Sequence, residues 1–176
     1  MSDVPQRAHS PGLRRPLVLD SAAALQAEIE RIIAAQAAGR LRATGNWTPA
    51  QICEHLARLI EFSYDGFPFR VRWHIRAASY VAKWVAWKPF VRYVFRPGYR
   101  LQGTQRALIP AEDARFPAAS ARLSAAVERI ARGEQMLQPS PFEGHISHEQ
   151  WVFVHLRHAE LHLSFLALDD RRLSDG

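Results

Sequence analysis

The sequence predicts an all-α protein, most economically a four-helix up-and-down bundle with an embellished middle crossover. Three observations lead to this prediction. Apolar residues recur at helical spacing in separate stretches, capping residues or glycines mark the ends of these stretches, and no alternating strand pattern is visible. The 176 residues fit one domain. We expect this domain at residues 19–170, after a flexible N-terminal arm at residues 1–18 that is rich in proline and arginine.

The first predicted helix covers residues 22–38. Asp20 or Ser21 can cap its first turn, and Gly39 ends it because glycine readily adopts the left-handed conformation that follows many helices. Its apolar stripe consists of Leu25, Ile29, Ile32 and Ile33.

The second predicted helix starts at a capping box with proline at the first helical position, Thr48-Pro49-Ala50-Gln51, and runs to about Asp65. His55 shares one face of this helix with four apolar side chains. We therefore expect His55 to point into the core, where a buried metal ligand would have to lie. The four apolar residues are Ile52, Leu56, Leu59 and Phe62.

The middle of the chain combines aromatic and basic residues. Residues 72–95 are expected to be helical, with a break or kink at Pro89, and residues 96–116 to form a loop. Between Gly66 and Ala111 the chain has nine Lys or Arg residues and no Asp or Glu, whereas the rest of the chain carries a net charge of −3. The basic character of the protein therefore belongs to this one segment.

Two further helices complete the predicted bundle. One covers about residues 117–132 and ends at Gly133, and a connection rich in Pro and Gly follows at residues 134–146. The last helix begins at a second capping box, Ser147-His-Glu-Gln150, and is expected to continue to about Leu168.

Histidines are the most informative residues of the last predicted helix. His155, His158 and His162 lie within about 60° of one another around its axis. His158 and His162 are four residues apart, so they can chelate one divalent metal ion. A third ligand must come from elsewhere, and His55 is the best candidate. Three protein ligands leave coordination positions open, as in reactive metal sites. The single cysteine, Cys53, excludes an intramolecular disulfide and a Cys-rich zinc site.

The histidines also have a purely structural interpretation, because a histidine on an apolar helix face usually packs in the core. Three imidazoles buried together without a metal would leave ring nitrogens unsatisfied, at about 1–3 kcal/mol each, which favours a metal site. His155 could hydrogen-bond a ligand, act as an acid or base beside the metal, or replace a ligand, but we favour simple packing. Glu54 and Glu160 point away from the expected site and are not expected to be ligands.

Two motifs of the sequence resemble the DinB/YfiT-like superfamily. The first joins Trp47 to His55-Leu56, and the second is His158-x-x-x-His162 on the final predicted helix, about a hundred residues later. The resemblance is closer to an uncharacterised branch of the superfamily, whose motifs match residues 45–57 and 144–165. It covers most of residues 18–168.

The resemblance implies an up-and-down helical bundle that binds a divalent metal ion through His55, His158 and His162, often as a homodimer. Relatives in the superfamily include thiol-dependent transferases and isomerases, and others are described as metal-dependent hydrolases. In better-known members the last ligand begins the sequence His-Arg-Gly-Gln, whereas here His162 is followed by Leu163-Ser-Phe165. The resemblance therefore implies the ligand set without a specific activity.

Taken together, these features predict a divalent-metal-dependent enzyme, either a thiol-dependent transferase or a hydrolase, that acts on a small-molecule substrate. A bound metal would polarise a carbonyl or lower the pKa of a water or thiol. Nickel, zinc, iron and manganese all accept imidazole ligands. A low-molecular-weight thiol is a candidate second cofactor, and the basic segment is compatible with an anionic substrate.

The alternative is a non-catalytic binding module with a vestigial or structural metal site. In that case the basic aromatic segment, residues 70–100, would bind an anionic membrane or an acidic partner. The segment could instead cover the bundle with its aromatic side chains or form a lid over the metal. Nucleic acid is not expected, because no recognition motif accompanies the charge.

The sequence also predicts where the protein is found. No apolar run reaches the roughly 18–20 residues that span a bilayer, and the first residues lack the apolar core of a signal peptide. We therefore expect a cytoplasmic protein.

Overall fold

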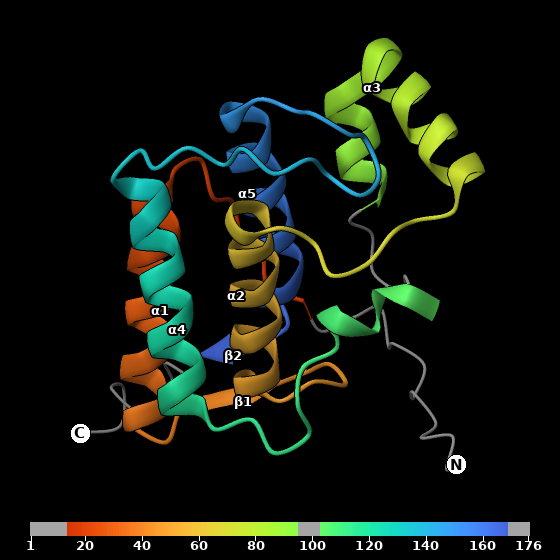
Figure 1. Ribbon diagram of the computed structural model, residues 1–176. Coiled ribbons are helices and arrows are strands. Elements are labelled where there is room, and N and C mark those ends of the chain that lie inside the picture. The colour runs from red at the N-terminus through yellow and green to blue at the C-terminus, as the bar shows by residue number, and fades with distance from the viewer. Residues whose placement is uncertain (1–13, 95–102, 169–176) are drawn as a thin grey trace.

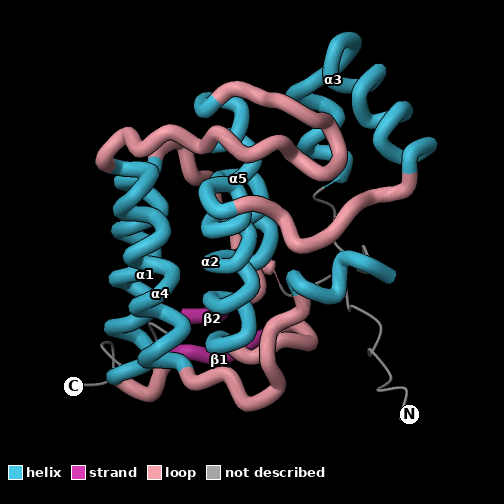
Figure 2. The backbone as a smooth tube through the Cα atoms, in the orientation of Figure 1, coloured by secondary structure: helices cyan, strands magenta, loops and turns pink. Residues whose placement is uncertain are grey.

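The computed structural model describes residues 14–94 and 103–168, and this part of the chain is mostly helical (Figure 1). Two short strands, β1 (Leu41–Ala43) and β2 (Leu166–Leu168), form the small sheet in Figure 2. The helices are α1 (Ala22–Ala37), α2 (Pro49–Asp65), α3 (Trp73–Val94), the 3-10 helix η1 (Gly103–Leu108), α4 (Phe116–Ala131) and α5 (His148–Leu163).

Four of these helices, α1, α2, α4 and α5, lie side by side around one apolar core (Figures 1 and 2). Each contacts two neighbours, in the order α1, α4, α2, α5 and back to α1. The predicted positions of α1, α2 and α4 are confirmed, because their apolar stripes and end signals are local. Ser21 caps α1, and both predicted capping boxes form, at Thr48 and at Ser147.

The directions of the helices differ from the predicted up-and-down order. Near the start of α2, the Ala111 N–H donates to Glu54 Oε2 (3.1 Å), and at its end the Tyr64 hydroxyl donates to the Glu134 carbonyl (3.3 Å). Because Ala111 precedes α4 and Glu134 follows it, α2 and α4 run in the same direction. The prediction of strict alternation was wrong for this pair, since the connection at residues 66–115 returns the chain to the beginning of α2.

The small sheet was not predicted. Strand β1 pairs antiparallel with β2, with Leu41 opposite Leu168 and Ala43 opposite Leu166. The predicted last helix, which was to continue to about Leu168, instead ends at Leu163. Strands of three residues are too short to show an alternating pattern, so periodicity could not reveal them.

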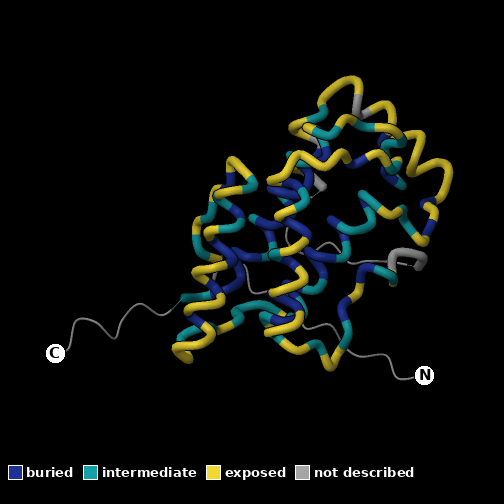
Figure 3. The backbone as a smooth tube through the Cα atoms, turned by 60° about the vertical axis from the view of Figure 1, so that its left-hand side comes forward, coloured by how far each residue is buried: buried dark blue, intermediate teal, exposed yellow. Residues whose placement is uncertain are grey.

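A sharp break divides α3 into two legs. Ala86 has non-helical angles (φ −157°, ψ 57°), three residues before Pro89, so the predicted position of the break was wrong by one turn. A proline fits the first turn of a new helix, whereas inside a helix its ring meets the carbonyl four residues earlier. Trp87 and Val91 of the second leg pack against the core. Residues 73–85, the outer leg, project away from the four packed helices (Figures 1 and 3).

The loop predicted at residues 96–116 contains the helix η1, and residues 95–102 lie outside the described part of the chain. Among the described residues, no helix combines the length and the hydropathy that a bilayer crossing requires.

Residues 14–18, the described part of the predicted flexible arm, are docked against the end of α5. The Arg15 N–H donates to the Ser164 carbonyl (3.0 Å), and Arg14 Nε donates to Ser164 Oγ (2.8 Å). Arg15 also pairs with Glu28, a buried carboxylate of α1. The packed chain therefore includes residues before position 19, and the remainder of the predicted arm, residues 1–13, lies outside the described residues.

Candidate metal centre

The structure brings together the three histidines that the sequence analysis selected as metal ligands. His55 comes from α2 and His158 and His162 come from α5, and one ring nitrogen from each lies within 4.8 Å of the others. The three ring centroids form a nearly equilateral triangle, with separations of 4.7 Å, 4.8 Å and 4.6 Å. Every pair of rings meets at a steep angle, between 67° and 88°. The rings therefore surround a common point instead of stacking on one another.

Helix geometry explains why these three side chains meet. His158 and His162 lie one turn apart on the same face of α5. His55 Nε2 lies 3.0 Å from His158 Nε2, and His155 Nε2 lies 3.1 Å from Ser63 Oγ one layer further along the two helices. From the first contact to the second, the residue number rises on α2, from His55 to Ser63, and falls on α5, from His158 to His155. The two helices are therefore antiparallel and pack face to face through these contacts.

A backbone carbonyl fixes the orientation of His55. Its Nδ1 lies 2.6 Å from the carbonyl oxygen of Leu108, the last residue of η1. A carbonyl only accepts hydrogen bonds, so Nδ1 carries the ring proton and Nε2 presents its lone pair to His158. Metal-binding histidines commonly have their second nitrogen fixed in this way.

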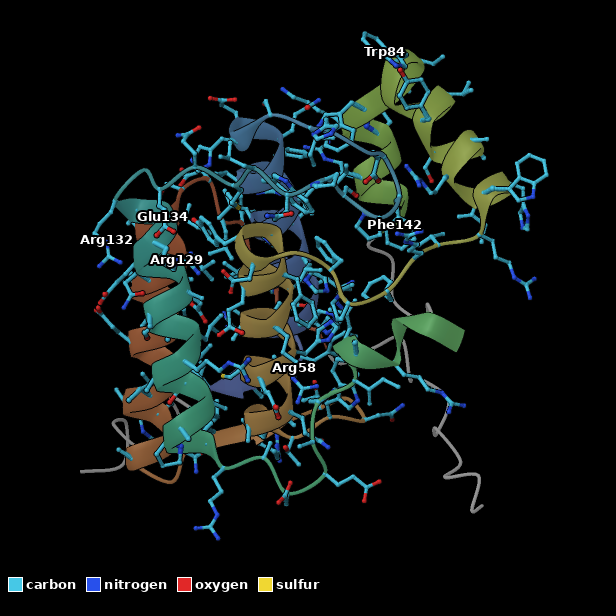
Figure 4. All side chains as sticks on the ribbon, in the orientation of Figure 1. Arg58, Trp84, Arg129, Arg132, Glu134 and Phe142 are labelled. Atoms are coloured by element: carbon cyan, nitrogen blue, oxygen red, sulfur yellow. The ribbon has the colours of Figure 1, made fainter. Side chains whose placement is uncertain are left out.

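The chain around Leu108 is in turn held by α2. Arg58, labelled in Figure 4, donates to the carbonyls of Ala107 (3.2 Å) and Ile109 (2.7 Å) and pairs with Glu54. Glu54 also accepts from the N–H of Ala111 (3.1 Å). We call residues 107–111 the strap, because these contacts hold the Leu108 carbonyl over His55.

Trp47 covers another side of the cluster. Its ring stacks on His162, with centroids 5.3 Å apart and planes 17° apart, and it lies 4.7 Å from the His55 ring. The Thr44 N–H and hydroxyl both donate to the Phe165 carbonyl (2.8 Å and 2.9 Å), which joins this segment to the end of α5. A Cβ at Gly45 would lie only 3.3 Å from the Phe165 ring, so the close approach favours glycine there.

Burial lowers the pKa of two of the three histidines of the site, His55 and His158. Desolvation lowers the pKa of His55 to about 4, more than offsetting the hydrogen bond to Leu108, and nearby Arg58 lowers it further. Desolvation, followed by the neighbouring histidines, also lowers the pKa of His158 well below its ordinary value. Metal ions bind neutral imidazole, so at neutral pH protons do not compete for these nitrogens. His162 is only half-buried, which leaves that side of the cluster the most open.

The residues present fit a divalent metal. Two nitrogens that bind one ion at about 2.1 Å lie roughly 3–3.5 Å apart, close to the 3.0 Å between His55 Nε2 and His158 Nε2. A ring nitrogen of His162 lies within 4.8 Å of the other two ligand atoms, so a small movement of its side chain would complete the ligand set. Three imidazole nitrogens form a ligand set that zinc, nickel, iron and manganese accept.

His155 is not part of this cluster. The Ser63 hydroxyl donates to the Ile60 carbonyl (2.5 Å), so Ser63 Oγ accepts from His155 Nε2–H. The His155 ring stacks on Trp151, with planes 11° apart. Its Nδ1 is buried without a hydrogen-bond partner among the described residues, and desolvation lowers its pKa to about 3. This geometry favours the packing interpretation.

The carboxylates and the cysteine near these helices are engaged elsewhere. Glu160 pairs with Arg157 (2.7 Å) and accepts a hydrogen bond from the Leu19 N–H (2.7 Å). Its side chain is 15% exposed, so Glu160 is a salt-bridged and largely buried residue and not a metal ligand. Cys53 is buried, and desolvation raises the pKa of its thiol to about 12.

Two contributors to the site were not assigned a role from the sequence. Trp47 belongs to the motif that also contains His55, so its distance from His55 in the sequence was a signal that its ring could lie near the site. The Leu108 carbonyl offered none, because a backbone carbonyl is the same in every residue.

Comparison with known protein families gives a match over most of the chain. The family described as "Protein of unknown function (DUF1569)" matches residues 14–169, which include all the elements described above. No curated protein and no solved structure matches the chain. Because the match covers most of the sequence and all three candidate ligands, the chain belongs to this family, DUF1569.

Proposed function

We propose that this protein is a divalent-metal-dependent enzyme, either a thiol-dependent transferase or a hydrolase, with His55, His158 and His162 as its metal ligands. The proposal includes membership of the DinB/YfiT-like superfamily, as the resemblance implies, with the ligands on the second and last core helices of a four-helix bundle. One observation carries the proposal: three histidine rings from two helices surround a common point, with a ring nitrogen of each within 4.8 Å of the others.

The residues around the ligands would give the site its chemical character. Leu108 holds His55 with its Nε2 lone pair directed inward, and Trp47 packs against the rings of His55 and His162. A substrate would approach from the half-buried side of His162. A bound divalent ion would supply Lewis acidity there, to polarise a carbonyl or to lower the pKa of a water or thiol.

The ligand set does not choose between thiol transfer and hydrolysis, because both use an open position on the metal. We propose a small-molecule substrate and retain a low-molecular-weight thiol as a candidate co-substrate. The homodimer that the resemblance implies stays a prediction, to be checked by analytical ultracentrifugation.

The first experiment is elemental analysis of tag-free protein purified without chelator. Wild-type protein is expected to contain about one equivalent of nickel, zinc, iron or manganese per chain. The His55→Ala variant and the His158→Ala/His162→Ala variant should lose the metal while they keep the helical circular dichroism of the wild type.

The matched control is His145→Ala, which removes an exposed histidine from the connection before α5. This variant should keep its metal. Wild-type protein that holds no metal, even after reconstitution with each of the four ions, would contradict the proposal. A positive result would justify assays of thiol transfer and of ester and amide hydrolysis.

A further inference from the structure

The outer leg of α3 exposes large apolar side chains to an unusual degree. Trp73, Trp84 and Val85 are each more than 70% exposed, and Tyr80 and Val81 are more than half exposed. Trp84 lies at the far end of this leg, away from the four packed helices (Figure 4). Large contiguous apolar surfaces of this kind mark sites of interaction, because leaving them in water costs free energy.

These apolar side chains gather on one face of the outer leg. At 100° per residue, Trp73, Tyr80, Val81 and Trp84 fall within an arc of about 100°, and Val85 lies about 40° beyond its edge. Arg72, just before the helix, and Arg76 fall on the adjoining side. A helix with aromatic residues on one face and basic residues beside them is typical of segments that lie in the plane of a membrane surface.

The charge around this face has a single sign. No acidic residue occurs between Asp65 and Glu112. Among the described residues, five basic side chains in α3 or just before it are exposed, namely Arg70, Arg72, Arg76, Lys88 and Arg92. Basic side chains next to an apolar face attract anionic lipid headgroups, and tryptophan and tyrosine settle at the headgroup level, where their rings are partly wet.

Charge also argues against a second copy of the chain as the occupant of this face. A second copy that paired through the same face would bring its arginines against these arginines, which repel. The outer leg is separated from the rest of α3 by the break at Ala86, and no described helix is both long and apolar enough to cross a membrane.

We propose that the outer leg of α3 is an interfacial anchor that binds the protein to anionic lipid surfaces, with Trp73, Tyr80 and Trp84 inserted at headgroup depth. The proposal is independent of the metal centre. It assigns to α3 a role that packing does not explain, since the core is covered by Trp87 and Val91 of the second leg.

The test is co-sedimentation of the full chain with large unilamellar vesicles. One set contains phosphatidylcholine alone, and the other contains about 30% phosphatidylglycerol, at about 0.1 M salt. The protein is expected to bind the anionic vesicles at least tenfold more strongly than the neutral ones. Raising the salt to about 0.5 M should weaken the binding severalfold, because it screens the arginines.

Two variants examine the two parts of the anchor. Trp73→Ser/Trp84→Ser removes two large apolar side chains. Arg72→Gln/Arg76→Gln removes two positive charges, and each basic side chain near an anionic surface strengthens binding by about fivefold. Each should reduce binding to anionic vesicles by tenfold or more. The controls are Val18→Ser/Leu137→Ser, which removes apolar side chains of similar exposure elsewhere, and Arg132→Gln, an exposed arginine at the end of α4. Both controls should bind like the wild type.

Three outcomes would overturn the proposal. The first is the absence of binding to anionic vesicles at low salt. The second is equal loss of binding in the α3 variants and the controls. The third is vesicle binding that does not depend on Trp73 and Trp84, combined with self-association in sedimentation velocity, or capture of an acidic protein, that does depend on them. Circular dichroism and metal content of each variant show that the fold is intact.

Discussion

His155 and His158 lie one turn apart on α5, and their surroundings give them different chemistry. His158 Nε2 faces His55 Nε2 at 3.0 Å, whereas His155 Nε2–H is used by Ser63 and its Nδ1 has no hydrogen-bond partner among the described residues. An unsatisfied buried acceptor costs about 1–3 kcal/mol, and replacing it with an apolar group can be nearly neutral. At the residue scale, His155 is therefore the histidine that the protein can lose.

We predict that His155→Phe keeps the metal content of the wild type and changes the free energy of unfolding by less than about 1.5 kcal/mol. Phenylalanine can preserve the stacking on Trp151. His158→Phe, a substitution of the same size on the same face, should lose the metal. Elemental analysis and urea denaturation check both variants. Loss of metal from His155→Phe would show that His155 supports or replaces a ligand.

At the scale of the elements, the strap at residues 107–111 connects η1 to the metal ligands. Arg58 holds the carbonyls on both sides of Leu108, and the Leu108 carbonyl holds His55. Groups that orient a metal ligand typically change metal affinity by 10–100-fold when they are removed, although they never touch the metal.

We predict that Arg58→Met lowers metal affinity by about 10–100-fold, while about one equivalent still binds at saturation. The reason is that the strap loosens and His55 loses its fixed orientation. The matched control is Arg129→Met, which breaks the ion pair with Glu134 (2.5 Å) near the end of α4 and makes no contact with Glu54 or the strap. Competition with a metal-sensitive dye measures both affinities, and equal affinities in the two variants would contradict the role of the strap.

Short sequence signals predicted some features of the helices and strands and missed others. Capping boxes at Thr48 and Ser147 were predicted because each signal lies within four residues. The β1–β2 pair was missed, because it joins segments more than a hundred residues apart and each strand is three residues long. The break in α3 was placed at Pro89, but the chain breaks at Ala86, where the proline can occupy the first turn of the next leg.

At the scale of the whole molecule, burial of neutral histidines links stability to pH. The pKa of His55 falls to about 4 and that of His155 to about 3 in the folded protein, from ordinary values near 6.5. Below pH 6.5 the unfolded chain binds more protons than the folded chain, so acid favours unfolding. The stability contributed by these groups is fully present above pH 6.5 and is lost as pH falls towards their folded pKa values.

We therefore predict that metal-free protein loses stability as pH falls from about 7 to about 4, with a contribution on the order of 3 kcal/mol from His55 alone. Urea denaturation at a series of pH values measures this. His155→Phe should show a shallower dependence, since one buried titrating group is gone. A flat profile between pH 7 and pH 5 would show that the histidines are not buried in the neutral form.

The sequence by itself predicted the positions of α1, α2 and α4 and the start of α5, and it selected the three candidate ligands. Apolar periodicity, caps and the spacing of His158 and His162 involve residues within a turn or two of one another, so they can be read along the chain. The tertiary structure decided the rest. It placed His55 beside His158, set the Leu108 carbonyl on His55, turned α4 parallel to α2, and left the outer leg of α3 exposed. These features depend on packing between distant segments and on backbone groups that are alike in every residue, so local patterns do not record them.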